Sequence, residues 1–214
     1  MNRKGPHTGM PPRMTQEQRR ISTRRKILDA AENVLIEQGY ANLTTTKVSM
    51  AAGVSQGALF RHFPSKIELM GAVAQDVYHT LAGEYESIFD TLEPGSDFIR
   101  ESIRLLWKTF NAPRQMASYD LTFAARTDPA LQARLEPVVR DHRQRIGRIT
   151  HRVLSSAGIS SKDFTALADL ILMGIQGAAI NHIAAADPDA LEHRLNYIEC
   201  LAKQLTRKSP KPHK

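Results

Sequence analysis

The sequence predicts an all-α protein, in which an N-terminal three-helix unit is joined by a long helix to a helical bundle. Apolar residues recur at helical spacing through most of the 214 residues, and no stretch alternates apolar and polar side chains as a half-buried strand does. Glycine and proline separate the periodic segments, at Gly53, Pro64, Pro113 and Gly158. With 42% hydrophobic residues, the chain can bury a sizeable core.

The N-terminal residues 1–14 are rich in glycine and proline and poor in apolar side chains, so we expect a disordered basic arm there. A first helix is predicted from Thr15 to Gln38, and Gly39 should end it. Its apolar residues follow the i, i+4, i+7, i+8 spacing of one helix face: Ile27, Ala31, Val34 and Leu35.

Residues 43–66 predict two short helices around a tight turn. Thr44 can cap the first helix, and Gly53 supplies the left-handed residue that stops it. Ser55 can cap the second helix, which Pro64 ends. Two helices joined in this way form a helix-turn-helix, which lays its second helix in the major groove of DNA. Residues 15–64 are therefore expected to be a DNA-binding domain.

The distribution of charge supports this interpretation. Residues 1–66 carry 11 Lys and Arg against 4 Asp and Glu, whereas residues 67–214 carry 18 of each sign. The whole net charge of +7 thus lies on the segment with the helix-turn-helix. Clustered positive charge is typical of a protein that contacts a phosphate backbone, so double-stranded DNA is the expected partner.

Polar and small side chains dominate the exposed face of the second helix. Gln56 can pair with adenine, Arg61 with guanine or a phosphate, and Ala58 can contact a thymine methyl group. The free backbone N–H groups at the start of this helix, from Ser55 through Gly57 to Ala58, form an anion site suited to a phosphate.

The second domain is predicted over residues 65–206, with a basic tail at 207–214. Ser65 can cap a helix that runs to about Leu92, and Glu68 would complete a capping box. Because no Gly/Ser-rich linker follows the helix-turn-helix, this long helix should transmit movement between the two domains. The remaining expected helices are Asp97–Asn111, Arg114–Thr127, Pro129–Ala157, Lys162–Ala186 and Asp187–Thr206.

The run Ala52-Gly53-Val54-Ser55-x-Gly57-x-Leu59-Phe60-x-His62-Phe63-x-Ser65-Lys66 resembles the TetR family of bacterial transcriptional regulators. The resemblance implies base contacts from Gln56 and Ala58. It also implies phosphate contacts from Thr44, Thr45, Thr46, His62 and Lys66, and a contact with the DNA backbone from the aromatic ring at Phe60. The chain departs from the family pattern at Phe60, where tyrosine is usual, and at Thr46, where a basic residue is common. Both departures predict a weaker hold on the DNA backbone, which the basic arm would offset.

The resemblance also implies a cavity in the body that binds a small, mostly apolar effector. Aromatic and methionine side chains with a few polar groups can line such a cavity. The expected contacts are Trp107, Phe110, Tyr119, Phe123, Met173 and Gln176.

The last two expected helices are apolar on more than one face, beyond what one small core requires. Their apolar residues are Leu167, Ile171, Ile175, Ile183, Leu191, Leu195, Ile198, Leu201 and Leu205. These helices predict a two-fold homodimer through a four-helix arrangement. The alternative is that all these faces pack within one chain.

Other classes of protein have less support in the sequence. Cys200 is the single cysteine, and Asp76 and His79 form one carboxylate–histidine pair where a di-iron bundle needs two, so no metal, cofactor or catalytic residue is predicted. The absence of a signal peptide or an apolar span predicts a cytoplasmic protein without membrane contact. We therefore expect a dimeric, ligand-responsive regulator, a repressor released by its effector. The alternatives are a constitutive regulator without a cavity, and a helical enzyme or metal protein.

Overall fold

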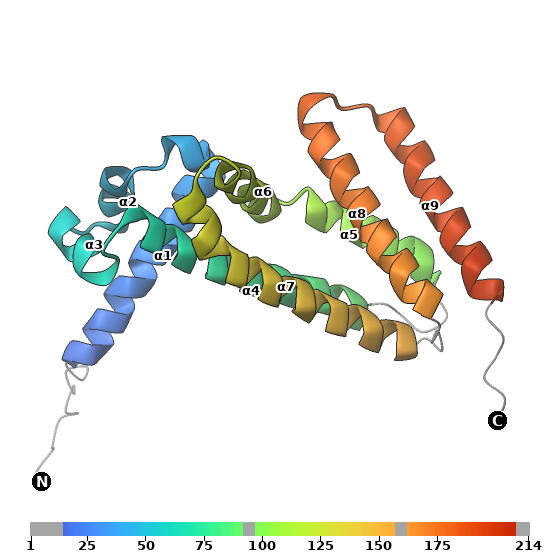
Figure 1. Ribbon diagram of the computed structural model, residues 1–214, viewed down its shortest axis with the longest axis horizontal. Helices are drawn as coiled ribbons and strands as arrows, with labels where there is room; N and C mark the ends of the chain where they lie inside the picture. Colours follow the sequence, from blue (N-terminus) through green and yellow to red (C-terminus); the bar gives the residue numbers. More distant parts are fainter. Residues whose placement is uncertain (1–14, 92–96, 157–161, 209–214) are drawn as a thin grey trace, which may run out of the picture.

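The computed structural model describes residues 15–91, 97–156 and 162–208, and these ranges are built from α-helices. The predicted all-α class is confirmed. The helices are α1 (Gln16–Asn42), α2 (Thr45–Ala52), α3 (Gln56–His62), α4 (Lys66–Asp90), α5 (Phe98–Phe110), α6 (Pro113–Ala125), α7 (Pro129–Ser156), α8 (Lys162–Ala184) and α9 (Pro188–Lys208). In Figure 1, α1–α3 lie at one end of an elongated molecule, and α5, α8 and α9 lie at the other.

The first helix begins and ends through local contacts. The Thr15 hydroxyl accepts from the Gln18 N–H, and the Gln18 side chain accepts in return from the Thr15 N–H, which makes a capping box. Gly39 interrupts the helix with φ 75° and ψ 166°, where the sequence predicts its end. The chain then makes one more turn to Asn42 before the helix-turn-helix.

The long helix α4 runs beside α7 along the length of the molecule (Figure 1). Ser65 caps it by accepting from the Glu68 N–H at 3.1 Å. The predicted capping box is only half formed, because the Glu68 carboxylate lies 3.4 Å from Arg134 of α7 instead of binding the Ser65 N–H. This ion pair joins the start of α4 to α7.

Two apolar cores lie along α4. The first joins α1–α3 to the N-terminal half of α4, to α6 and to α7, around Leu35, Leu59 and Leu69. The second joins the C-terminal half of α4 to α5, α7, α8 and α9, around Tyr85 and Ile175. A displacement at one end of α4 therefore reaches both cores through one rigid element.

Several predicted boundaries shift by a few residues. The helix α6 begins at Pro113, since proline is favourable in the first helical turn. The helix α9 continues to Lys208, past the predicted end at Thr206 and into the predicted tail. The predicted arm at 1–14 and the rest of the tail, 209–214, lie outside the described residues. Within the described part of the chain, no helix combines the length and apolar character needed to cross a bilayer.

Candidate nucleic-acid interface and body cavity

The two short helices have the caps that the sequence predicts. Thr44 accepts from the Lys47 N–H at 3.2 Å, and Ser55 accepts from the Ala58 N–H at 3.1 Å. Gly53 adopts the left-handed conformation, with φ 65° and ψ 35°, and turns the chain between the helices. Leu59, fully buried, fixes α3 against the core. This arrangement is a helix-turn-helix with the opposite face of α3 turned to solvent.

Gln56, at the first position of α3, contacts α2. Its Nε2 donates to Thr46 Oγ1 at 2.5 Å. Both residues are exposed, so the bond forms on the surface that would face DNA. The hydroxyl of Thr46 keeps its own proton to donate, and Gln56 keeps its carbonyl oxygen as an acceptor.

The remaining exposed side chains of α3 are apolar and cationic. The Phe60 ring is 42% exposed, and Arg61 is exposed beside it. Burial lowers the pKa of His62, and the nearby cations Arg20 and Arg24 of α1 lower it further. The closeness of α1 arginines to His62 places positive charge from two helices on one face.

Lys66 does not extend freely toward solvent. Its Nζ donates to the Tyr40 carbonyl oxygen at 3.3 Å and lies 4.2 Å from the centre of the Tyr40 ring. Burial lowers the pKa of this amine. The two residues are 26 positions apart, so this contact could not be predicted from local sequence.

Asp76 and His79, the carboxylate–histidine pair of α4, each contact an arginine of another helix. Asp76 accepts from Arg25 of α1 at 2.7 Å, and Arg145 of α7 lies 3.1 Å from His79 Nδ1. Among the described residues, no group of three or more His, Cys, Asp or Glu side chains is placed to hold a metal ion.

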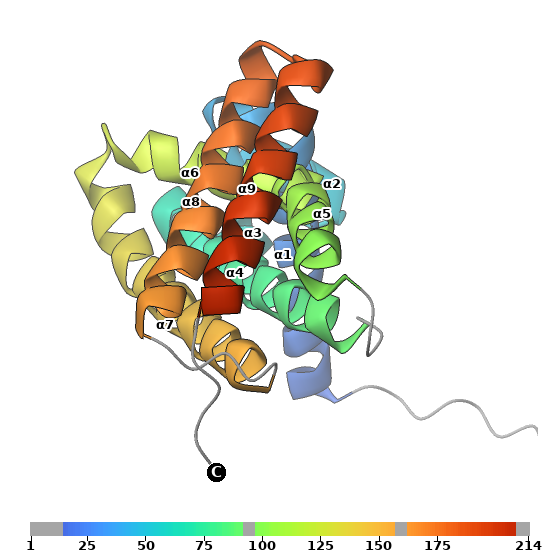
Figure 2. The same ribbon diagram turned by 90° about the vertical axis from the view of Figure 1, so that its right-hand side faces the viewer.

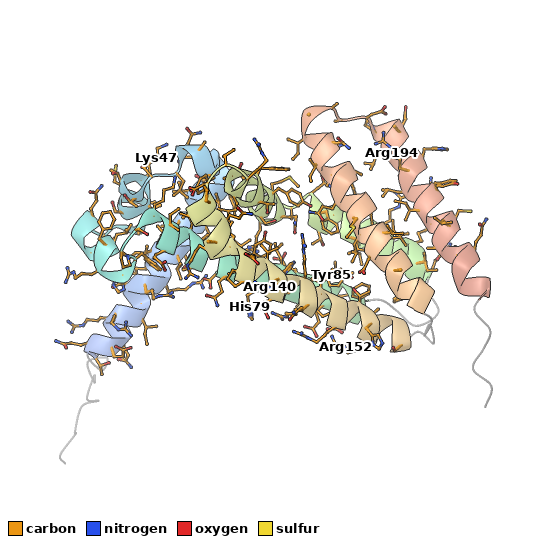
Figure 3. The ribbon with its side chains drawn as sticks, in the orientation of Figure 1. Lys47, His79, Tyr85, Arg140, Arg152 and Arg194 are labelled. Carbon is orange, nitrogen blue, oxygen red and sulfur yellow. The ribbon has the colours of Figure 1, made fainter. Side chains whose placement is uncertain are left out.

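A cavity of about 70 Å³ lies within the second core. Its lining comes from α4, α5, α7, α8 and α9 and is almost wholly apolar: Tyr85, Phe89, Phe98, Ile99, Ser102, Ile103, Leu106, Thr150, Val153, Ala168, Ile171, Leu172 and Ala202. Figure 3 shows Tyr85 in the body, where α4 lies beside α7, and Lys47 at the helix-turn-helix end. The cavity wall therefore includes the far end of the helix that begins at the helix-turn-helix.

None of the six predicted effector contacts lines this cavity. Phe123 and Met173 are 54% and 67% exposed, and Tyr119 is buried near the first core. Trp107 makes an edge contact with the His182 ring, at 5.5 Å between centres. Sequence periodicity places side chains on a helix face but does not say which faces meet, so it could not select the residues that line this cavity.

A larger groove, of about 660 Å³, lies between α6 and α7. It is open to solvent, and its walls carry Arg126, Arg140 and Arg143. These charges make it unsuited to an apolar molecule, so the smaller cavity is the better effector candidate.

The helices α8 and α9 lie side by side on the face remote from α1–α3 (Figure 2). Large apolar side chains are exposed on this pair: Leu170 (65%), Met173 (67%), Ile183 (64%), Tyr197 (68%) and Leu201 (41%). A Cβ added at Gly174 or Gly177 would meet nothing within 4 Å. Large exposed apolar side chains of this kind are typical of interaction surfaces.

Comparison with known proteins agrees with this architecture. Residues 27–73 match the family model of bacterial regulatory proteins of the tetR family, and residues 93–198 match that of the tetracyclin repressor-like C-terminal domain. The chain is 32% identical over 186 residues to the HTH-type transcriptional regulator CymR of Pseudomonas putida, covering 87% of this chain and 92% of CymR. The chain belongs to the TetR family.

Other known proteins are also similar to this TetR-family protein. An uncharacterized HTH-type regulator of Mycobacterium tuberculosis is 27% identical over 187 residues, covering 87% of this chain and 96% of its own. Among solved structures, the multidrug binding protein EbrR in complex with imidazole has a TM-score of 0.65 at 22% identity, covering 96% of this chain and all of EbrR. A Rhodococcus transcriptional regulator has a TM-score of 0.66 at 22% identity, covering 87% and 99%. At these identities the two structures establish the fold alone.

Proposed function

We propose that this TetR-family regulator is a repressor that binds a pseudo-palindromic operator as a homodimer and is released by a small, largely apolar effector. The observation that carries the proposal is the position of α4. Its first turn follows the helix-turn-helix directly, and its far end supplies Tyr85 and Phe89 to the cavity wall. Occupation of the cavity would therefore move the helix that holds the DNA-binding domain.

The homodimer is proposed through α8 and α9. Their exposed apolar side chains form a face that one chain leaves uncovered, and two such pairs would make a four-helix interface. A two-fold dimer presents two α3 helices to successive turns of the major groove, which explains a pseudo-palindromic operator. Its action on DNA would place the protein in the cytoplasm.

In the proposed contact with DNA, Gln56 and Ala58 face base edges, and phosphates are bound by Thr44, Thr45 and Thr46 together with the backbone N–H groups of α3. Phe60, Arg61 and His62 flank this surface. Lys66 is also a proposed phosphate contact: one N–H of its amine donates to the Tyr40 carbonyl oxygen, which leaves the others to bind a phosphate.

The effector mechanism is tested by linkage. A ligand that releases the operator must bind the free dimer more tightly than the DNA-bound dimer, and a hundredfold loss of operator affinity requires a difference of about 3 kcal/mol. We expect operator affinity, measured by fluorescence anisotropy, to fall as a cavity ligand is added. Equal ligand affinity for the free and the DNA-bound protein would favour the alternative, a constitutive regulator.

A further inference from the structure

The described walls of the cavity carry no charged side chain. Among the described residues that line it, the polar ones are three hydroxyl-bearing residues, Tyr85, Ser102 and Thr150. An ion moved from water into such surroundings loses its hydration without gaining a partner. The lining therefore favours an uncharged occupant.

Ser102 supplies a hydroxyl group that nothing satisfies. The residue is 8% exposed, and its Oγ has no hydrogen-bond partner. Tyr85 and Thr150 differ, because their hydroxyl groups bond to each other at 2.8 Å. Buried polar groups are nearly always paired, so an orphan hydroxyl on a cavity wall points to a missing partner.

The charge that acts on Tyr85 in the cavity wall is negative. Burial raises the pKa of Tyr85, the hydrogen bond with Thr150 opposes this shift, and the carboxylate of Asp169 raises the pKa again. An anion in the cavity would meet the same repulsion from Asp169. No lysine or arginine is among the described lining residues to offset it.

The size of the cavity limits what fits without movement. An apolar cavity of about 150 Å³ is known to hold a benzene molecule. At about 70 Å³, the cavity is too small for one aromatic ring. A ligand of that size can be enclosed only if the walls move apart, and these walls include α4.

We propose that the effector is an uncharged, mainly apolar molecule with one hydrogen-bonding group, which Ser102 Oγ binds, and that its entry separates α4 from α5 and α8. This inference rests on the proposed function of the cavity as the effector site. It adds the chemical class of the effector and the residue that orients it.

Four one-ring probes that differ in one group test the class: toluene, benzyl alcohol, benzoate and benzylammonium. Binding to the full-length protein is measured at millimolar concentration by ligand-observed NMR, and the thermal midpoint is followed in parallel. We expect benzyl alcohol to bind most tightly, toluene next, and the two ions least. Tighter binding of benzoate or benzylammonium, or no binding of any probe, would overturn the proposal.

The substitution Ser102→Ala tests the orienting residue. It should lower the affinity for benzyl alcohol by roughly threefold to tenfold, the effect of one hydrogen bond, and leave the affinity for toluene unchanged. Equal losses for both probes would mean that Ser102 only shapes the wall, and would contradict the proposal. Ser118→Ala is the matched control: this buried serine on α6 is hydrogen-bonded to Gln115, so its loss should lower stability but leave both probes bound.

The same samples separate this inference from the proposed function. Operator binding without a probe reports on the DNA-binding domain alone. If a probe binds through Ser102 but does not change operator affinity, effector release is wrong and the ligand class stands. If no probe binds while the operator is still bound, the ligand class is wrong.

Discussion

Tyr40 of α1 and Asp120 of α6 are joined across the boundary between the DNA-binding domain and the body. The Tyr40 N–H donates to Asp120 Oδ2 at 2.5 Å. From the other side, Lys66 at the start of α4 donates to the Tyr40 carbonyl oxygen and lies over its ring. The residue that follows the break in α1 is thus held by both α4 and α6, so a shift of either helix reaches the helix-turn-helix.

Gly39 makes this joint possible, and Gly39→Ala should destabilise the protein. Its φ of 75° with ψ of 166° lies in a region that only glycine adopts readily, and a Cβ would stand 2.9 Å from Asp120 Oδ2. We expect a loss of roughly 1–3 kcal/mol in the free energy of unfolding, measured with urea. The control, Gly83→Ala, lies inside α4 with nothing within 4 Å and should be neutral or stabilising. A Gly39→Ala protein as stable as the control would refute the strained joint.

The bond between Thr46 and Gln56 should orient the base-reading side chain. Thr46→Val removes the hydroxyl at nearly constant size, and we expect it to relax base preference at the position that Gln56→Ala also relaxes. A well-placed contact with a base is worth about 1–3 kcal/mol, so discrimination there should fall about tenfold.

Thr45→Val is the control for this pair, because it removes a neighbouring hydroxyl that does not contact Gln56. It should weaken all duplexes alike. If Thr46 acts only by orienting Gln56, the double variant Thr46→Val with Gln56→Ala should discriminate between bases at this position as well as Gln56→Ala alone does. Additive losses would show that the two residues act independently.

The exposed face of α8 and α9 should hold the dimer together. Met173→Glu places a charge on this face, and we expect sedimentation to show a monomer with unchanged helical content and weak operator binding. Phe123→Glu is the control, since Phe123 is similarly exposed but lies on α6. A dimer that survives Met173→Glu but dissociates with Phe123→Glu would place the interface elsewhere.

His142 should make stability depend on pH. Burial lowers its pKa below the ordinary value of about 6.5, and a hydrogen bond at 3.1 Å to the Tyr78 carbonyl oxygen opposes the shift. As the pH falls through 6.5, the unfolded chain takes up a proton before the folded one, so the free energy of unfolding decreases. Urea unfolding at pH 7.5 and pH 5.5 should show this loss, which His142→Gln should reduce. His193→Gln, exposed on α9, should keep the original profile.

The caps of α2, α3 and α4 were predictable because each depends on residues three positions apart, as in Ser55 with Ala58. The cavity was not, because Tyr85 and Thr150 are 65 residues apart and only packing brings them together. The sequence does contain one sign of the cavity: Ser102 places a hydroxyl group on an otherwise apolar face of α5. Periodicity also does not separate a face that is buried within one chain from a face that stays exposed, so it could not show that Met173 is 67% exposed on α8.

Selection of bound duplexes from a random pool tests the central claim, that a dimer reads DNA with two α3 helices. We predict recovery of two inverted half-sites whose centres lie about one helical turn, or roughly 10 base pairs, apart. Gln56→Ala should lose preference at symmetric positions in both half-sites. A single unsymmetrical site, or a pool with no enrichment, would contradict the claim.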